Sequence, residues 1–259
     1  MSNDSDIVIR VEHLHTAFGP RVVHEDVSFD VRRSEVFGIL GGSGSGKSVL
    51  LRQMIGLYRP QRGRVLIGGE DMATAEGATR VALLKKIGVM FQLGALFGSM
   101  TLLENVRLPL EAHTNLSEDE MNLIARMKLD LVGLKGFENY LSAQISGGMV
   151  KRAAIARAMA LDPGILMLDE PSAGLDPVTS AGLDRLIVRL RDALGITVVV
   201  VTHELASIFA IADRVIMLDK HTKGIVAEGA PADLRDHSDN VWVQRFFNRE
   251  PEDVEANNA

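Results

Sequence analysis

The sequence predicts an α/β fold built on a mainly parallel sheet, with a small antiparallel sheet and an inserted helical subdomain. Three observations lead to this prediction. Short, continuously apolar runs alternate with helical periodicity over most of the 259 residues, as in parallel sheets covered on both faces. Apolar and polar residues alternate near the amino terminus, which predicts antiparallel strands. Between about residues 102 and 160 the patterns are helical and none predicts a strand.

The composition is that of a globular protein, with 46% hydrophobic and 24% charged residues. The formal net charge of −6 gives no basic footprint, so we expect no nucleic-acid partner. The absence of cysteine excludes disulfides and cysteine-based metal sites. Residues 1–15 do not read as a secretory signal, and apolar runs such as 196–201 are far below the ~20 residues that span a bilayer. We therefore expect any membrane role to depend on a partner.

The predicted elements follow one another along a single domain, residues 1–250. A buried strand at 35–40 runs into a glycine-rich turn and then into a helix from about Gly46 to Leu57. Alternating polarity predicts antiparallel strands at 7–15, 22–31 and 63–69. Further buried strands are expected at 87–91, 164–168, 196–201 and 214–218.

The helical subdomain is expected over about residues 95–162. Within it, Ser117 followed by Glu120 is the pattern of a capping box, which predicts a helix start there. That helix would carry the apolar residues Met121, Ile124 and Leu129. The last residues, 251–259, are acidic, and we expect a disordered tail.

The segment GGSGSGKS fits the phosphate-loop pattern G-x-x-x-x-G-K-[ST]. Its glycines let backbone N–H groups converge on phosphate oxygens, Lys47 would reach the β- and γ-phosphates, and Ser48 would ligate Mg²⁺. A glycine-rich turn can also be a mere flexible loop, but this one follows a predicted strand and opens a predicted helix, as phosphate binding requires. We expect ATP to contact Gly41, Gly42, Ser43, Gly44, Ser45, Gly46, Lys47, Ser48 and Val49.

Two acids, Asp169 and Glu170, follow the apolar strand GILML. Alone, such a pair is more often a solvated strand end. Beside a phosphate loop, Asp169 can hold Mg²⁺, and Glu170 can orient and deprotonate an attacking water.

Two further polar residues end predicted strands. His203 follows VVVVT, where a histidine can bond the γ-phosphate and sense its loss, although a lone histidine is more often structural. Gln92 follows IGVMF, where its amide can reach Mg²⁺ or the lytic water, the alternative being a surface glutamine. The presence of the other motifs favours the catalytic interpretation of both.

A second candidate phosphate cradle lies about a hundred residues after the first. Ser146, Gly147 and Gly148 open a predicted helix, and the first N–H groups of a helix lack internal partners and attract anions. One nucleotide does not need two cradles in the same chain.

In this order, the motifs resemble those of the ATP-binding cassette (ABC) transporter ATPases, which are P-loop NTPases, over nearly the whole chain. The resemblance implies a homodimer in which two copies lie head to tail. The helix start at 146–148 of one copy then closes over the ATP held by the other, and Asp176 in AGLDP links the two sites. It also implies that Phe18 stacks on adenine, although Phe18 could equally be a packed core residue.

Within that family, Met149 stands where the commonest signature has glutamine. The segment SGGM, together with QLGALF after Gln92, resembles the subgroup that powers bacterial lipid transport, the Mla (maintenance of lipid asymmetry) and Mce-type systems. The resemblance implies an integral-membrane, MlaE-like permease docking near residues 92–100, on Leu96, Phe97 and Met100 unless these are buried core. It places the chain on the cytoplasmic face of the bacterial inner membrane. It also allows for a small regulatory STAS-type subunit and a periplasmic lipid-binding subunit.

The predicted function is ATP hydrolysis that powers phospholipid transport. The alternatives are an ABC ATPase for another substrate, such as an amino acid or a metal, and a soluble ATP-switched assembly protein. The soluble assembly protein is disfavoured because the chain has one cassette and no sustained heptads. The carboxyl-terminal aromatic residues either hold the dimer together or pack on their own domain; they are Trp242, Phe246 and Phe247.

Overall fold

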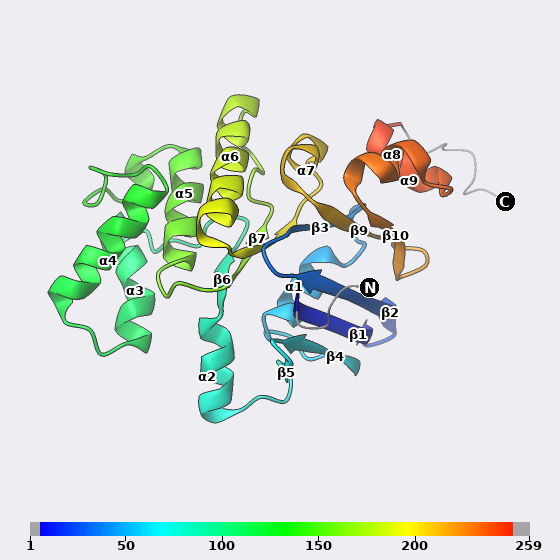
Figure 1. The fold of residues 1–259 in the computed structure, drawn as a ribbon, viewed down its shortest axis with the longest axis horizontal. Helices are drawn as coiled ribbons and strands as arrows, with labels where there is room; N and C mark the ends of the chain where they lie inside the picture. Colours follow the sequence, from blue (N-terminus) through cyan, green and yellow to red (C-terminus); the bar gives the residue numbers. More distant parts are fainter. Residues whose placement is uncertain (1–5, 251–259) are drawn as a thin grey trace.

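A computed structural model describes residues 6–250, and its larger sheet has six strands in the order β10-β9-β3-β8-β7-β6 (Figure 1). Neighbouring strands from β9 to β6 are parallel, and β10 pairs antiparallel with β9. The strands are β3 Val36–Gly41, β6 Ile87–Met90, β7 Ile165–Asp169, β8 Thr197–Val201, β9 Arg214–Leu218 and β10 Ile225–Gly229. The five predicted buried strands are confirmed.

The edge strand β10 was not predicted. Its residues are half-buried or exposed, so they lack the continuous apolar run by which the sequence marks the other five strands.

The smaller sheet has four antiparallel strands in the order β2-β1-β4-β5. The alternating polarity predicts β1, β2 and β4, whereas the two-residue strand β5 was not predicted. They are β1 Ile7–Phe18, β2 Arg21–Arg32, β4 Arg62–Ile67 and β5 Glu70–Asp71, followed by helix α2 Gly77–Lys85.

Helix α1, Lys47–Met54, fills the space between the two sheets and buries Leu50, Leu51 and Met54 in their shared core. It is shorter than the predicted helix because Gly56 adopts a left-handed φ of 73° just after its end.

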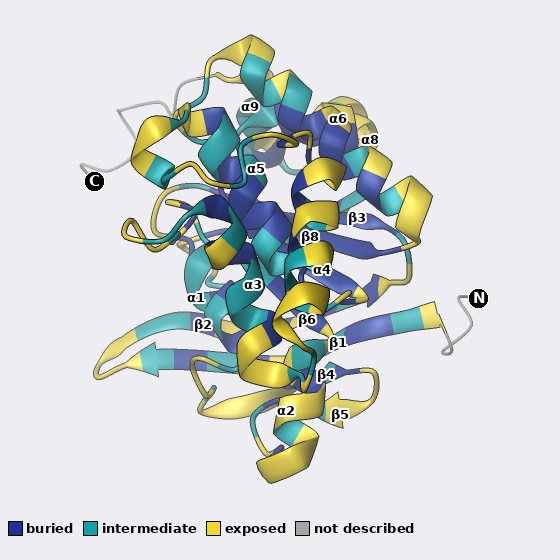
Figure 2. Ribbon diagram, turned by 90° about the vertical axis from the view of Figure 1, so that its left-hand side faces the viewer, coloured by how far each residue is buried: buried dark blue, intermediate teal, exposed yellow. Residues whose placement is uncertain are grey.

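The opposite face of the large sheet is covered by helices (Figures 1 and 2). Three of them lie between β6 and β7 in the sequence, within the region expected to be helical: α3 Leu102–His113, α4 Glu118–Leu131 and α5 Gly147–Ala158. A short 3₁₀ turn, Ser142–Gln144, precedes α5, and α6 Pro177–Leu194 completes the layer. The capping box predicted from Ser117 and Glu120 opens α4.

The carboxyl end forms three short helices, α7 Leu205–Ile211, α8 Pro231–His237 and α9 Val241–Asn248. Val243 and Phe247 of α9 are buried against Leu40 of β3 and Met217 of β9. The aromatic segment thus packs on its own chain, which is one of the two alternatives that its sequence left open. The predicted acidic tail, 251–259, lies outside the described residues.

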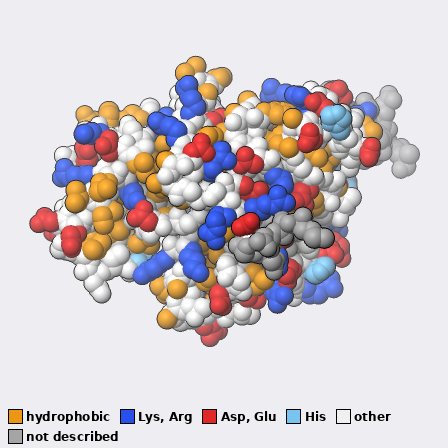
Figure 3. Space-filling model, viewed as in Figure 1, with side chains coloured by type: hydrophobic (Ala, Val, Ile, Leu, Met, Phe, Trp, Pro, Cys, Tyr) orange, Lys and Arg blue, Asp and Glu red, His pale blue; other side chains and the backbone are white. Residues whose placement is uncertain are grey.

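On the face shown in Figure 3, side chains of both charge signs are interspersed, with apolar patches among them over the helical end. Within the described part of the chain, we find no helix that is both long and apolar enough to span a bilayer.

Candidate functional site

The phosphate loop runs from the end of β3 to the start of α1, as its sequence context predicts. Gly46 has a left-handed φ of 94°, and a Cβ there would lie 2.4 Å from Nε2 of His24, so no other residue fits without a shift. The Lys47 ammonium donates to the carbonyl oxygens of Gly41 at 2.7 Å and Gly42 at 3.1 Å. Burial lowers the pKa of Lys47, while the charges of Glu170 and Asp169 oppose that shift.

One cavity of about 990 Å³ brings four of the predicted motifs together. Its size is at the upper end of what small-molecule sites occupy in proteins. Its walls come from six elements that are far apart in the sequence. They are Phe18, Arg21, Val23, Gly41, Gly42, Ser43, Gly44, Gly46, Lys47, Ser48, Val49, Gln92, Glu170, His203, Leu205, Phe246 and Arg249.

Glu170 and His203 form a direct pair that sequence reasoning did not predict. The His203 Nδ1 lies 2.8 Å from Glu170 Oε1, and the Thr202 hydroxyl donates to Glu170 Oε2 at 3.1 Å. Glu170 also has a left-handed φ of 47°, which is unfavourable for a residue with a Cβ. The adjacent ends of β7 and β8 create this pair.

Two members of the predicted set, Ser45 and Asp169, are buried and do not line the cavity. Asp169 is buried, and its Oδ1 has no hydrogen-bond partner among the described residues. Loss of water raises the pKa of Asp169, and the neighbouring Glu170 charge adds to this. The buried Ser45 hydroxyl is likewise without a partner in the described part of the chain.

Lys151 of α5 is a central residue that the sequence analysis missed. Its ammonium donates to the carbonyl oxygen of Gln92 and, at 3.3 Å, to that of Glu170. Burial lowers the pKa of Lys151, and the Glu170 and Asp169 carboxylates oppose that shift. A lysine on a helix normally lies in solvent, so only its place in the motif GGMVK gives any signal.

The segment after Gln92 is held by side chains from two helices. The amide of Asn105, buried in α3, accepts from the Phe97 N–H at 2.8 Å and donates to three carbonyl oxygens, those of Phe97, Met100 and Thr101. Arg157 of α5 donates to the carbonyl oxygens of Ala95 and Gly94. The backbone of this loop is therefore fixed to α3 and α5.

The other predicted cradle, Ser146 to Gly148, does not line this cavity. Ser146 caps α5, and its hydroxyl accepts from the Met149 N–H at 3.3 Å. Asp176 caps α6, accepting from the N–H groups of Val178 and Thr179 at 3.0 Å each. The starts of the two helices touch, because a Cβ on Gly148 would lie 2.4 Å from Thr179 Cγ2. Ser146, Gly147 and Asp176 are exposed there.

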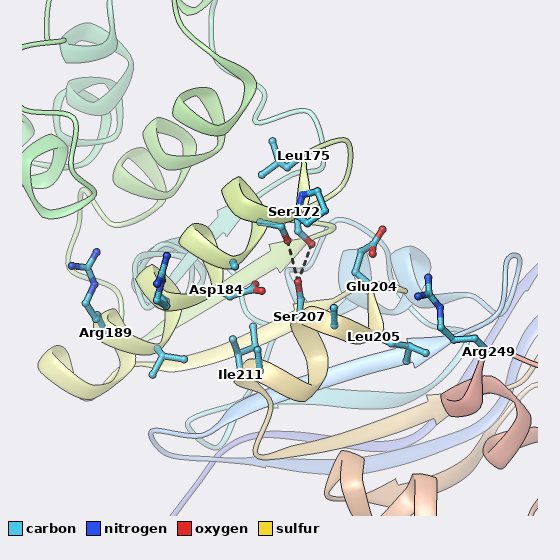
Figure 4. A pocket seen from close by; sticks show the side chains of 16 residues that line it. Ser172, Leu175, Asp184, Arg189, Glu204, Leu205, Ser207, Ile211 and Arg249 are labelled. Atoms are coloured by element: carbon cyan, nitrogen blue, oxygen red, sulfur yellow. Dashed lines mark hydrogen bonds between the residues drawn. The ribbon is translucent and has the colours of Figure 1, made fainter.

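A second cavity, of about 760 Å³, lies between α6 and α7 (Figure 4). The Ser207 hydroxyl is 3.4 Å from those of Ser172 and Ser180, which joins the segment after Glu170 to both helices. Leu205 and Arg249 line both cavities, so the two adjoin next to His203.

Known proteins are similar to this chain in sequence and in fold. A family model described as ABC transporter matches residues 24–173. The chain is 42% identical over 242 residues to the probable ribonucleotide transport ATP-binding protein mkl of Mycobacterium leprae, covering 93% of this chain and 69% of that protein. It is 36% identical over 237 residues to the intermembrane phospholipid transport system ATP-binding protein MlaF of Haemophilus influenzae, with 92% and 89% covered.

Two solved structures of ABC transporter ATPases are similar to this chain in fold. The cbiO1 protein of Clostridium perfringens, part of the ABC transporter complex cbiONQ, superposes with a TM-score of 0.81 at 28% identity, covering 90% of this chain and 92% of that one. The ATP-binding cassette MJ0796, in a dimeric structure bound to ADP and phosphate, superposes with a TM-score of 0.77 at 31% identity, covering 86% and 98%. The predicted fold and family are confirmed. The chain belongs to the ABC transporter family, as one of its ATP-binding, ATP-hydrolysing subunits.

Proposed function

We propose that this subunit powers phospholipid transport through an integral-membrane permease. The observation that carries the catalytic part is the single cavity shared by Lys47, Glu170 and His203. Glu170 is the general base for the attacking water, and His203 holds its carboxylate in place and contacts the γ-phosphate. Phe18, which lines the same cavity and is half-exposed, stacks on adenine.

The oxygen ligands of the site suit Mg²⁺. Ser48 and Gln92 line the cavity, and the buried Oδ1 of Asp169, next to Glu170 in the sequence, has no partner among the described residues. We assign these three residues to the Mg²⁺ site, where the ion would supply positive charge that offsets the charge of the phosphates.

The homodimer that we propose uses the exposed helix starts at Ser146 and Asp176. Neither lines the cavity of its own chain, and bare N–H groups at the start of α5 suit a phosphate. In this arrangement Ser146, Gly147 and Gly148 close over the partner's ATP, and Asp176 connects the two sites.

The permease docks on the loop after Gln92. Leu93 is 86% exposed and Phe97 50% exposed, whereas Leu96 packs partly against the core. Lys151 ties the Gln92 carbonyl to the Glu170 carbonyl, so a change at the catalytic acid reaches the docking loop through one side chain. We therefore propose that the subunit acts at the cytoplasmic face of the bacterial inner membrane.

The assignment of the substrate rests on the similarity of this chain to its relatives. One set is named for phospholipid transport and another for ribonucleotide transport. We favour phospholipid because of the segments QLGALF and SGGM, and we extend the proposal to an MlaE-like permease, a STAS-type regulatory subunit and a periplasmic lipid-binding subunit.

The catalytic assignment is tested with Glu170→Gln, which keeps the shape of the side chain but removes the base. We expect phosphate release to fall by about 10²–10⁴-fold while ATP affinity is kept. Asp192→Asn on the exposed side of α6 is the control and should hydrolyse at the normal rate. Normal turnover by Glu170→Gln would overturn the assignment.

The substrate assignment is tested by isolating the tagged chain from gently solubilised bacterial membranes and identifying its partners and bound lipids. A permease that copurifies with phospholipid and a periplasmic lipid-binding subunit is the expected result. A permease accompanied by a soluble binding protein for an amino acid, metal or nucleotide would reject the lipid assignment.

A further inference from the structure

Helix α9 is firmly attached beside the nucleotide cavity. The Asn240 side chain caps it by accepting from the N–H groups of Trp242 and Val243. The Gln244 amide donates to the Ser238 carbonyl at 2.7 Å, and Phe247 is buried. The hydrogen bonds stabilise the helix itself, and Val243 and Phe247 attach it to the sheet through the apolar cluster that they share with Leu40 of β3 and Met217 of β9.

One side of α9 lies against the phosphate loop. A Cβ on Gly42 would be 4.0 Å from Trp242 Cζ2, which is van der Waals contact, and the Phe246 ring lines the nucleotide cavity. Leu40, just before the loop, belongs to the same apolar cluster as Val243. Through Phe246 the last described helix thus forms part of the cavity wall.

Arg249 follows directly on that helix. It caps α9 with a left-handed φ of 59° and lines both cavities together with Leu205. Leu205 lies two residues after His203, and Arg249 and Leu205 are the two residues that line both cavities, so Arg249 lies where the two cavities adjoin. In Figure 4 its side chain extends from the end of α9 to the side of the pocket where Glu204 lies. Within residues 6–250, no carboxylate forms an ion pair with Arg249.

Lys47 alone does not supply enough positive charge in the cavity to offset the negative charge of a triphosphate. Lys47 faces the carboxylates of Asp169 and Glu170, which offset its charge. A guanidinium presents a planar set of donors that match two phosphate oxygens at once, and it keeps its charge at all relevant pH values.

We propose that Arg249 binds the terminal phosphate of ATP within its own chain, so that the carboxyl-terminal helix contributes a nucleotide contact. The inference rests on the proposed nucleotide site and adds a residue outside the family motifs. It makes the subunit discriminate between ATP and ADP through a segment that lies beyond the residues matched by the family model.

The test compares affinities of Arg249→Ala and the wild type for Mg²⁺-ADP and for a Mg²⁺-bound non-hydrolysable ATP analogue, by titration calorimetry. We expect about a tenfold loss for the ATP analogue and less than a twofold loss for ADP, because a charged hydrogen bond to the last phosphate is removed. Arg249→Lys should recover part of the loss. The ratio of the wild-type to the Arg249→Ala affinity for the ATP analogue should be unchanged at tenfold lower protein concentration, since the contact lies within one chain.

The matched control is Arg245→Ala, one turn earlier on α9, which lines neither cavity. An equal loss with Arg245→Ala, an equal loss for both nucleotides, no loss, or a loss that disappears on dilution would each overturn the role of Arg249. Failure of the wild type to bind either nucleotide would instead reject the nucleotide site itself.

Discussion

A buried histidine connects the small sheet to the phosphate loop. His24 of β2 is fully buried, and its Nδ1 lies 3.0 Å from the Thr16 hydroxyl, which in turn bonds with the Gln53 amide of α1. Its Nε2 lies against Gly46. Three side chains from β1, β2 and α1 thus support the end of the loop that begins the helix.

This histidine makes the fold sensitive to acid. Burial lowers the pKa of His24 from 6.5 to about 4, so below pH 6.5 the unfolded chain binds a proton that the folded chain does not. Stability is fully present above pH 6.5 and falls as the pH drops towards 4, by about 3 kcal/mol at most from this residue.

We expect His24→Gln to make the urea unfolding free energy less dependent on pH between 7 and 5, because glutamine does not titrate. The measurement is urea denaturation at both pH values. His113→Gln, at an exposed position, serves as the control and should leave the slope as it is. An unchanged slope in His24→Gln would contradict the prediction.

At the scale of elements, the contact between the starts of α5 and α6 places the two predicted interface motifs side by side. Ser146 and Asp176 are each helix caps, and Gly148 lets the helices approach until Thr179 Cγ2 occupies the space of a Cβ. Gly148 is therefore needed for the packing of α5 on α6, in addition to any role of the N–H groups at this helix start in binding phosphate.

We expect Gly148→Ala to destabilise the fold by about 1–3 kcal/mol and to lower ATPase activity, because the new methyl group separates the two helices. Thr179→Ser removes the obstructing methyl, so the double variant should recover most of both losses. Chemical denaturation and phosphate release measure them. Gly164→Ala, where a Cβ meets nothing within 4 Å, is the control. Failure of Thr179→Ser to rescue would show that the contact is not the cause.

For the whole molecule, the nucleotide cavity is lined by residues from parts of the chain that lie far apart in the sequence. Phe18 ends a strand of the small sheet, Lys47 begins α1, and Arg249 ends the last described helix. A ligand in this cavity contacts both ends of the chain, so its binding energy stabilises the complete fold.

We therefore expect a non-hydrolysable ATP analogue at a hundredfold excess over its Kd to stabilise the chain by about 2.7 kcal/mol, raising Tm by several degrees. Lys47→Ala should lose most of this shift, because the ammonium that reaches the phosphates is gone. Differential scanning calorimetry measures it, with Lys135→Ala as an exposed control. An equal shift in Lys47→Ala would contradict the role of that lysine.

The sequence by itself determined the five buried strands, three strands of the small sheet, the phosphate loop and the order of the motifs. These depend on local patterns, such as apolar runs in buried strands, glycines in the loop, and Ser117 with Glu120 at a helix start. Edge strand β10 was not predicted because a half-buried strand has no continuous apolar run in its sequence.

The tertiary structure alone decided which distant residues meet. Glu170 and His203 bond because β7 and β8 are adjacent, and Lys151 reaches the carbonyls of Gln92 and Glu170 only because α5 packs over β6 and β7. Arg249 joins the cavity because α9 lies against Gly42. In each case the burial or exposure of a charged side chain depends on the element packed beside it, and local sequence carries no information about that neighbour.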